Sequence, residues 1–154
     1  MKASFDFAAK SGFGTAIRDS RYAFPALEMV HLVGLGLLLG SILLFNARFF
    51  GFGMRRQTLR EVAADFAPWT RLALILMVVS GIPMFAAKAG ELWREDLAGF
   101  TVKMSLIAVG VVFHYSVQIP LAKAENVSRG RIAATVSLVV WFGAAIAGLT
   151  LEFL

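Results

Sequence analysis

The chain has 154 residues, the length of one domain, of which 58% are hydrophobic and 16% are charged. A soluble domain carries roughly 25% charged residues, so this composition and the mean hydropathy of +0.74 exclude an ordinary soluble protein and favour one embedded in lipid. The absence of cysteine excludes disulfides, thiolate metal sites and covalently attached c-type haem, and the net charge of +5 indicates basic residues beside anionic lipid headgroups rather than a nucleic-acid partner.

Four long stretches of the chain contain no charged side chain. They are Met29–Ala47, Leu72–Ala87, Met104–Ala122 and Ile132–Leu151. About 20 mostly apolar residues form a helix that crosses the hydrocarbon core, and a helix satisfies its own backbone polar groups there. We therefore predict an all-α fold, a four-transmembrane-helix bundle that forms a single integral membrane domain over residues 1–154. Its spans are expected at about residues 24–50, 68–89, 99–120 and 131–153.

The first twenty residues lack the apolar core of a signal peptide, because charges recur from Lys2 to Asp6 and beyond. We expect a short N-terminal surface segment, with the first span acting as its own insertion signal. Pro25 stands where a first-turn proline is tolerated, whereas Pro83 lies inside the second span and predicts a kink.

The segment between spans one and two carries a helix signal. Thr58 and Glu61 have the spacing of a capping box. Apolar residues follow at the spacing of one helical face: Leu59, Val62, Ala63 and Phe66. This pattern predicts a short interfacial helix on the membrane surface; the alternative is a polar connector with chance periodicity.

Basic residues are divided between the two sides of the membrane. The loops after spans one and three, with their flanks, hold Arg48, Arg55, Arg56, Arg60, Arg71, Lys123, Arg129 and Arg131. The opposite side holds Lys2, Lys10, Arg18, Arg21, Lys88, Arg94 and Lys103. Because cytoplasmic loops carry an excess of Lys and Arg, we expect both loops in the cytoplasm. Both termini then lie on the non-cytoplasmic side of a bacterial inner membrane.

Polar side chains inside the spans carry most of the functional information, since lipid makes them costly. In the first span, Glu28 lies about 60° from His31 around the helix. In the third span, a polar stripe along one face joins Lys103, Gly110, His114 and Gln118. We expect both polar faces to point into the bundle.

Two histidines and a lysine in a helical bundle are typical of b-type haem binding, because neutral imidazole is a usual axial ligand. We expect His31 as the first iron ligand, with Lys103 and His114 as alternatives for the second. Glu28 would accept the other ring N–H of His31 or relay a proton. Gly34 and Gly110 would leave room for the flat macrocycle.

The depth of the two histidines argues against one haem held between them. If the helix starts are level, His114 lies about 12 Å deeper than His31. Three arrangements stay open: His31 pairs with Lys103, each histidine holds its own haem, or one histidine alone is a ligand. No catalytic residue is assigned, and a di-iron site is disfavoured because Glu28 has no further carboxylates within the other spans.

Parts of the chain resemble a family of small bacterial four-helix membrane proteins of unknown function. The first span shares Pro25–His31, followed by Gly34 and Gly40-Ser41; the second shares Pro68-Trp69-Thr70, Ser80-Gly81 and Phe85-Ala86; the third shares Phe100 and Lys103-Met104. The resemblance covers most of the chain from about residue 17 and implies the fold without an activity.

A looser likeness is to the copper-resistance D-type and HemJ-type (protoporphyrinogen oxidase) membrane proteins. They place a histidine in an early span and a lysine at the start of a later one, positions that His31 and Lys103 match. HemJ-type proteins bind haem b, so the likeness implies haem ligation, although Glu28 departs from their pattern.

The resulting expectation is a membrane protein that binds haem b and serves electron transfer, alone or as a subunit of a redox complex. The first alternative is a non-catalytic scaffold or accessory subunit, which could form a homo-oligomer through the small-residue pairs Gly36/Gly40 and Ala144/Gly148. The second is a small transporter or proton pathway that would use Glu28, His31, Lys103 and His114.

Overall fold

The computed structural model describes residues 2–150, and this part of the chain is helical without a strand. In chain order the elements are α1 (Lys2–Lys10), α2 (Gly12–Asp19), α3 (Ala23–Phe49), α4 (Leu59–Glu95), α5 (Leu97–Phe113), the π-helix η1 (His114–Gln118), α6 (Ile119–Lys123) and α7 (Val127–Thr150). The predicted all-α class is confirmed. The last residues of the fourth predicted span, 151–153, lie outside the described part.

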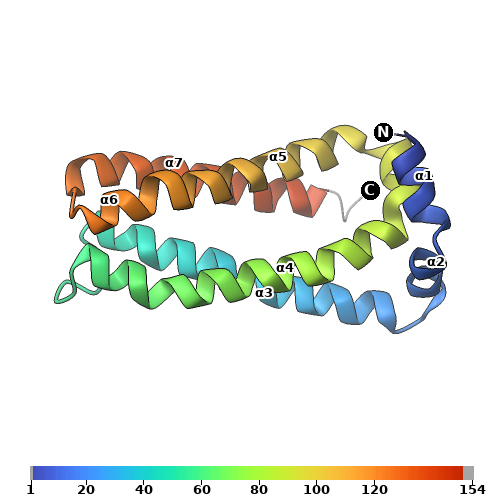
Figure 1. The fold of residues 1–154 in the computed structure, drawn as a ribbon, viewed down its shortest axis with the longest axis horizontal. Helices are drawn as coiled ribbons and strands as arrows, with labels where there is room; N and C mark the ends of the chain where they lie inside the picture. Colours follow the sequence, from blue (N-terminus) through green and yellow to red (C-terminus); the bar gives the residue numbers. More distant parts are fainter. Residues whose placement is uncertain (1, 151–154) are drawn as a thin grey trace.

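Two long helical hairpins lie side by side and form the bundle (Figure 1). In one hairpin α3 packs along α4, and in the other the continuous rod α5–η1–α6 packs along α7. Four rods in residues 2–150 are long and apolar enough to cross a membrane: Ala23–Phe49, Leu59–Glu95, Leu97–Lys123 and Val127–Thr150. This confirms the predicted four-helix bundle.

The exterior of the bundle is apolar, and its buried interior includes several polar side chains. Only 11–28% of the most apolar stretch of each rod is buried inside the protein. Large apolar side chains such as Met29 and Val112 are exposed, whereas Asn46, Ser80 and Gln118 are completely buried. This arrangement suits a lipid environment, in which polar groups must find partners inside the protein.

Helix α4 corrects the prediction of a separate interfacial helix. The capping box of Thr58 and Glu61 is present, but the helix it starts runs on without a break to Glu95. The helix continues through both Pro68 and Pro83.

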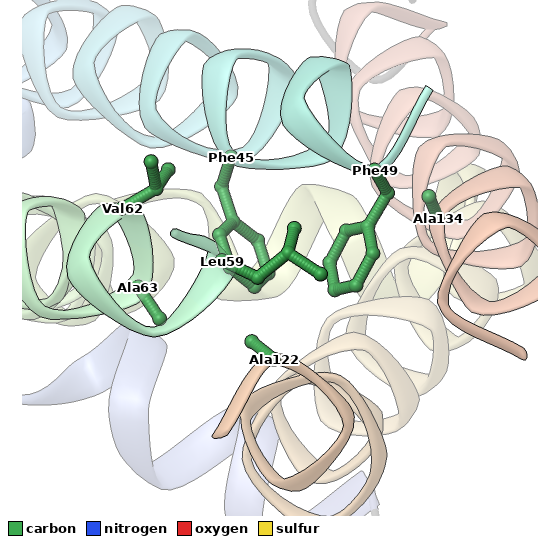
Figure 2. Close-up of a cluster of buried hydrophobic side chains, with 7 residues drawn as sticks. All are labelled: Phe45, Phe49, Leu59, Val62, Ala63, Ala122 and Ala134. Carbon is green, nitrogen blue, oxygen red and sulfur yellow. The ribbon is translucent and has the colours of Figure 1, made fainter. Parts of the chain in front are cut away.

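The apolar stripe at the start of α4 faces protein rather than the membrane surface. Leu59 and Val62 are buried against Phe45 and Phe49 of α3. Figure 2 shows these side chains together with Ala63, Ala122 and Ala134 in one cluster. The stripe therefore joins α4 to the other helices at this end of the bundle.

A carboxylate in the turn between α6 and α7 also stabilises the end of the bundle where α4 begins. Glu125 accepts hydrogen bonds from the backbone N–H groups of Leu59 (3.1 Å) and Arg60 (2.9 Å). An acid at a helix N-terminus satisfies unpaired N–H groups and complements the helix dipole. The second hairpin thus caps the long helix of the first.

The third rod changes from α- to π-helix at His114–Gln118. The N–H of Ile119 donates to the carbonyl of His114, five residues earlier. Pro120 has no N–H and its ring clashes with the carbonyl of Ser116 in a regular helix, so the wider turn accommodates the proline.

The predicted N-terminal surface segment consists of two helices, α1 and α2, which lie across the opposite end of the bundle (Figure 1). The ring of Phe5 lies 5.2 Å from that of Phe85 in α4 and 6.0 Å from that of Phe100 in α5. Arg18 of α2 donates to the carbonyl of Ala87. These contacts join the ends of the two hairpins.

The packing of α7 on α3 predicts that Gly130→Ala is destabilising. A Cβ at Gly130 would overlap the ring of Phe49, which is completely buried. Overpacking costs about 1–3 kcal/mol, offset in part by about 1 kcal/mol of helix propensity. Thermal unfolding in mild detergent measures the effect. Gly36→Ala is the matched control, because nothing lies within 4 Å of the added Cβ; equal unfolding temperatures for the two variants would contradict this packing.

Candidate functional site

The polar residues of the spans form two groups at different depths. One surrounds His31 near the α1–α2 end, and the other includes Asn46, fifteen residues further along α3. At 1.5 Å per residue these two positions are about 22 Å apart. His114 belongs to the second group, so the structure does not bring the two histidines together.

The His31 ring is held on α4 by a defined hydrogen bond. Its Nδ1 lies 2.9 Å from Oγ of Ser80, and that hydroxyl donates to the carbonyl of Leu76 at 2.6 Å. A hydroxyl has one proton, so Ser80 accepts the Nδ1–H of His31. In the neutral ring the lone pair is then on Nε2, the arrangement of a histidine that ligates a metal.

Ser80 and Gly81 of α4 therefore define the position of His31, although the sequence alone assigned neither of them a role. Ser80 is completely buried, and a Cβ at Gly81 would lie 3.2 Å from Cε1 of His31. The Ser80-Gly81 dipeptide inside an apolar span is the sequence signal that could have identified these two residues. A small polar residue beside a glycine lets a ring approach the helix closely.

His31 lines two adjoining cavities between the hairpins, which together we call the His31 cavity. Their volumes are about 70 and 80 Å³, and both are also lined by Met84 and Lys103. Glu28 lines the first cavity and Lys88 the second. The deeper wall of the first is apolar and includes Leu35, Leu38, Met77, Ile107, Trp141 and Ala144. The structure therefore places Glu28, His31 and Lys103 around one cavity.

Trp141 forms part of the apolar wall and is 3% exposed. Its Nε1–H is buried and has no hydrogen-bond acceptor among residues 2–150. Leaving a buried donor unpaired costs about 1–3 kcal/mol, so native structures rarely contain one.

The two glycines expected to make room for a macrocycle have other neighbours, which corrects that part of the prediction. A Cβ at Gly34 would lie 3.1 Å from Cβ of Leu76, and one at Gly110 would lie 3.0 Å from Cε2 of Trp141. Gly34 thus allows α3 to approach α4, and Gly110 receives the indole ring. The space beside each glycine is filled by protein.

The small-residue pairs expected at an oligomer interface are divided between inside and outside. Ala144 and Gly148 line the His31 cavity, and Lys103 passes over Gly148 with its Nζ 3.3 Å from where a Cβ would stand. Gly36 and Gly40 have open space beside them. The α7 pair, Ala144 and Gly148, therefore faces the inside of the bundle.

The second polar group is a chain of hydrogen bonds through the bundle core, which we call the buried amide network. Gln118 accepts the Nδ1–H of His114 at 3.1 Å and donates to Oδ1 of Asn46 at 2.6 Å. Asn46 in turn donates to Oγ of Ser137 at 3.3 Å and to the carbonyl of Ile42 at 2.8 Å. The network thus joins α3, η1 and α7.

All members of the buried amide network are excluded from solvent. His114 is 4% exposed, Ser137 is 1% exposed, and both amides are completely buried. The rings of Phe45 and Tyr115 flank His114 with their centroids 5.5 and 5.1 Å away. Sequence reasoning placed His114 and Gln118 on one stripe, but it found neither Asn46 nor Ser137 as their partners.

Residues 2–150 contain no cluster of three or more His, Asp or Glu side chains placed to hold a metal ion. A metal at the His31 cavity would therefore need a group such as a porphyrin to supply most of its ligands. Lys103 lines the same cavity as His31, whereas His114 is held in the buried amide network.

Comparison with known proteins places the chain in a family. A model described as a family of unknown function, DUF6644, matches residues 5–154. The chain belongs to this family. No curated protein and no solved structure matches it. The predicted membership of an uncharacterised family is thus confirmed, while the likeness to copper-resistance D-type and HemJ-type proteins finds no support in these comparisons.

The buried amide network predicts strong coupling between Asn46 and Gln118. Asn46→Leu or Gln118→Met alone should lower the free energy of unfolding by about 1–3 kcal/mol, because each leaves a buried partner unpaired. The double variant should cost less than the sum of the two, by roughly 0.5–3 kcal/mol. Chemical or thermal unfolding of all four proteins in one detergent measures this. Strictly additive losses would show that the two amides do not interact.

Proposed function

We propose that this integral membrane protein binds a b-type haem in the His31 cavity and serves electron transfer. The observation that carries the proposal is the hydrogen bond between His31 Nδ1 and Oγ of Ser80, which fixes the ring of a histidine that lines the cavity. A haem would supply one-electron chemistry at its iron, while the protein positions the ligand and sets the polarity of the site.

The other residues of the cavity suit a flat, mainly apolar group with acidic substituents. Leu35, Leu38 and Ile107 supply apolar walls. Lys88 and Lys103 are the basic residues beside His31 that could hold propionates. The unpaired Nε1–H of Trp141 is a further reason to expect a bound molecule here.

The size of the cavity requires the hairpins to separate when a haem binds. Pockets for drug-sized ligands measure roughly 300–1,000 Å³, whereas the two adjoining cavities measure about 70 and 80 Å³. The buried amide network joins the hairpins elsewhere, about 22 Å away along α3. An opening at His31 would therefore leave the network in place.

A second candidate is a lipid-soluble quinone, which the unpaired indole donor favours. A quinone ring is flat, smaller than a porphyrin and carries a carbonyl oxygen at each end. Trp141 Nε1–H could donate to one carbonyl, and Lys103 at the same cavity could donate to the other. This ligand would also serve electron transfer and needs less separation of the hairpins.

We further propose a bacterial inner membrane with both termini outside the cytoplasm. The end that holds the α3–α4 and α6–α7 turns carries eight basic residues, against seven at the opposite end. An excess of Lys and Arg marks the cytoplasmic side. The His31 cavity, at the opposite end of the bundle, would then meet any redox partner on the non-cytoplasmic side.

The haem proposal predicts an absorption spectrum that depends on His31. Protein purified in mild detergent after expression with haem supplied should show a Soret band, and α and β bands after reduction with dithionite. His31→Ala should lose these bands. Ser80→Ala should weaken haem binding about 10–100-fold, the usual effect of removing a partner of an axial histidine.

Two controls separate haem ligation from misfolding. His114→Gln removes the other histidine and should keep the spectrum, since His114 lies in the buried amide network. Circular dichroism should show equal helix content in all variants. A colourless, fully folded protein would refute haem binding, and a quinone in its organic extract that is absent from Trp141→Phe would establish the second candidate instead.

The proposed orientation is testable because the chain has no cysteine. Lys10→Cys and Arg56→Cys each introduce one exposed thiol, at opposite ends of the bundle. A membrane-impermeant maleimide added to spheroplasts should label Lys10→Cys, and it should label Arg56→Cys only after lysis. The reverse pattern would place both termini in the cytoplasm.

A further inference from the structure

The outer surface of the second hairpin carries a groove that the proposed function does not use. It lies between α7 and the rod α5–η1–α6, and its volume is about 500 Å³. We call it the α7 groove; its lining includes Pro120, Leu121, Arg129, Ile132 and Val136. Ile132 and Val136 are exposed, so the groove opens outward, where the bilayer surrounds the bundle.

The α7 groove has one charged end and a long apolar part. Arg129 is the one charged residue of its lining and lies in the first turn of α7. Val136 is seven residues further along the helix, about 10 Å deeper. Among residues 2–150, no hydrogen bond or ion pair engages the Arg129 guanidinium, whose side chain is exposed. The groove thus has a cation at the membrane boundary and an apolar part that extends along α7 toward the middle of the bilayer.

The surroundings of Arg129 add to the positive potential at this end. The α7 N-terminus contributes the positive end of a 24-residue helix. Eight basic residues and three acidic residues lie at this end of the bundle. The local field therefore favours an anion over a zwitterion.

We propose that the α7 groove binds an anionic phospholipid of the bilayer, such as phosphatidylglycerol. Its phosphate binds the Arg129 guanidinium, whose planar donors match phosphate oxygens in pairs. One acyl chain lies along Leu121, Ile132 and Val136. Basic pockets between transmembrane helices are a known form of lipid headgroup site, and this one is independent of any ligand at His31.

The test compares lipid association in vesicles. The protein is reconstituted in phosphatidylcholine that contains spin-labelled phosphatidylglycerol or spin-labelled phosphatidylcholine, and electron paramagnetic resonance measures the motionally restricted fraction. We expect the anionic lipid to be favoured about fivefold, the effect of one basic residue near a membrane surface. Arg129→Gln should remove most of this preference.

The matched control is Arg56→Gln, which makes the same change of charge at the same end of the bundle. Arg56 is exposed and does not line the groove. This variant should keep the preference for phosphatidylglycerol. Equal losses in Arg129→Gln and Arg56→Gln would overturn the proposal, because they would show a diffuse effect of net charge.

A second variant tests the apolar part of the groove without a change of charge. Ile132 is 69% exposed, so Ile132→Trp can fill the groove while the core stays intact. It should lower the association of phosphatidylglycerol, with an unchanged unfolding temperature. Soluble glycerol phosphate should not displace the lipid. Displacement by glycerol phosphate, or an effect of Arg129→Gln without one of Ile132→Trp, would refute an acyl chain in the groove.

Discussion

The hydrocarbon core offers no water to a buried polar group, and the bundle is organised around a place where several such groups satisfy each other. Asn46, Gln118, His114 and Ser137 form a chain of hydrogen bonds that joins three helices and both hairpins. In a low dielectric such bonds are strong and an unpaired member is costly. The cluster around Phe45 and Phe49 packs beside the network, on the same half of the bundle (Figure 2).

The other half of the bundle is built differently. The bond from His31 to Ser80 joins α3 to α4 and stays within the first hairpin. Between the hairpins lies the His31 cavity, with the unpaired indole N–H of Trp141 in its wall. The printed polar contacts between the hairpins therefore lie in the half that holds the network, whereas the half that holds His31 contains the cavity.

The sequence was sufficient for the spans because continuous apolar stretches and the capping box of Thr58 and Glu61 are local signals. It failed for the stripe of Leu59 and Val62, since an apolar face suits a lipid surface and a protein interior equally well. The roles of Ser80 and Ser137 were hidden because a serine in a span can bond to its own helix, as Ser80 also does. Gly34 and Gly110 were assigned to a cofactor because packing neighbours from distant helices cannot be read along one helix.

Helix α4 has 37 residues, which makes it about 55 Å long, nearly twice the roughly 30 Å of the hydrocarbon core. It touches α1 and α2 at one end, and Glu125 holds its N-terminus at the other. One continuous helix thus connects the two ends of the bundle. Because it is longer than the hydrocarbon core, it must tilt or project beyond the core at its ends.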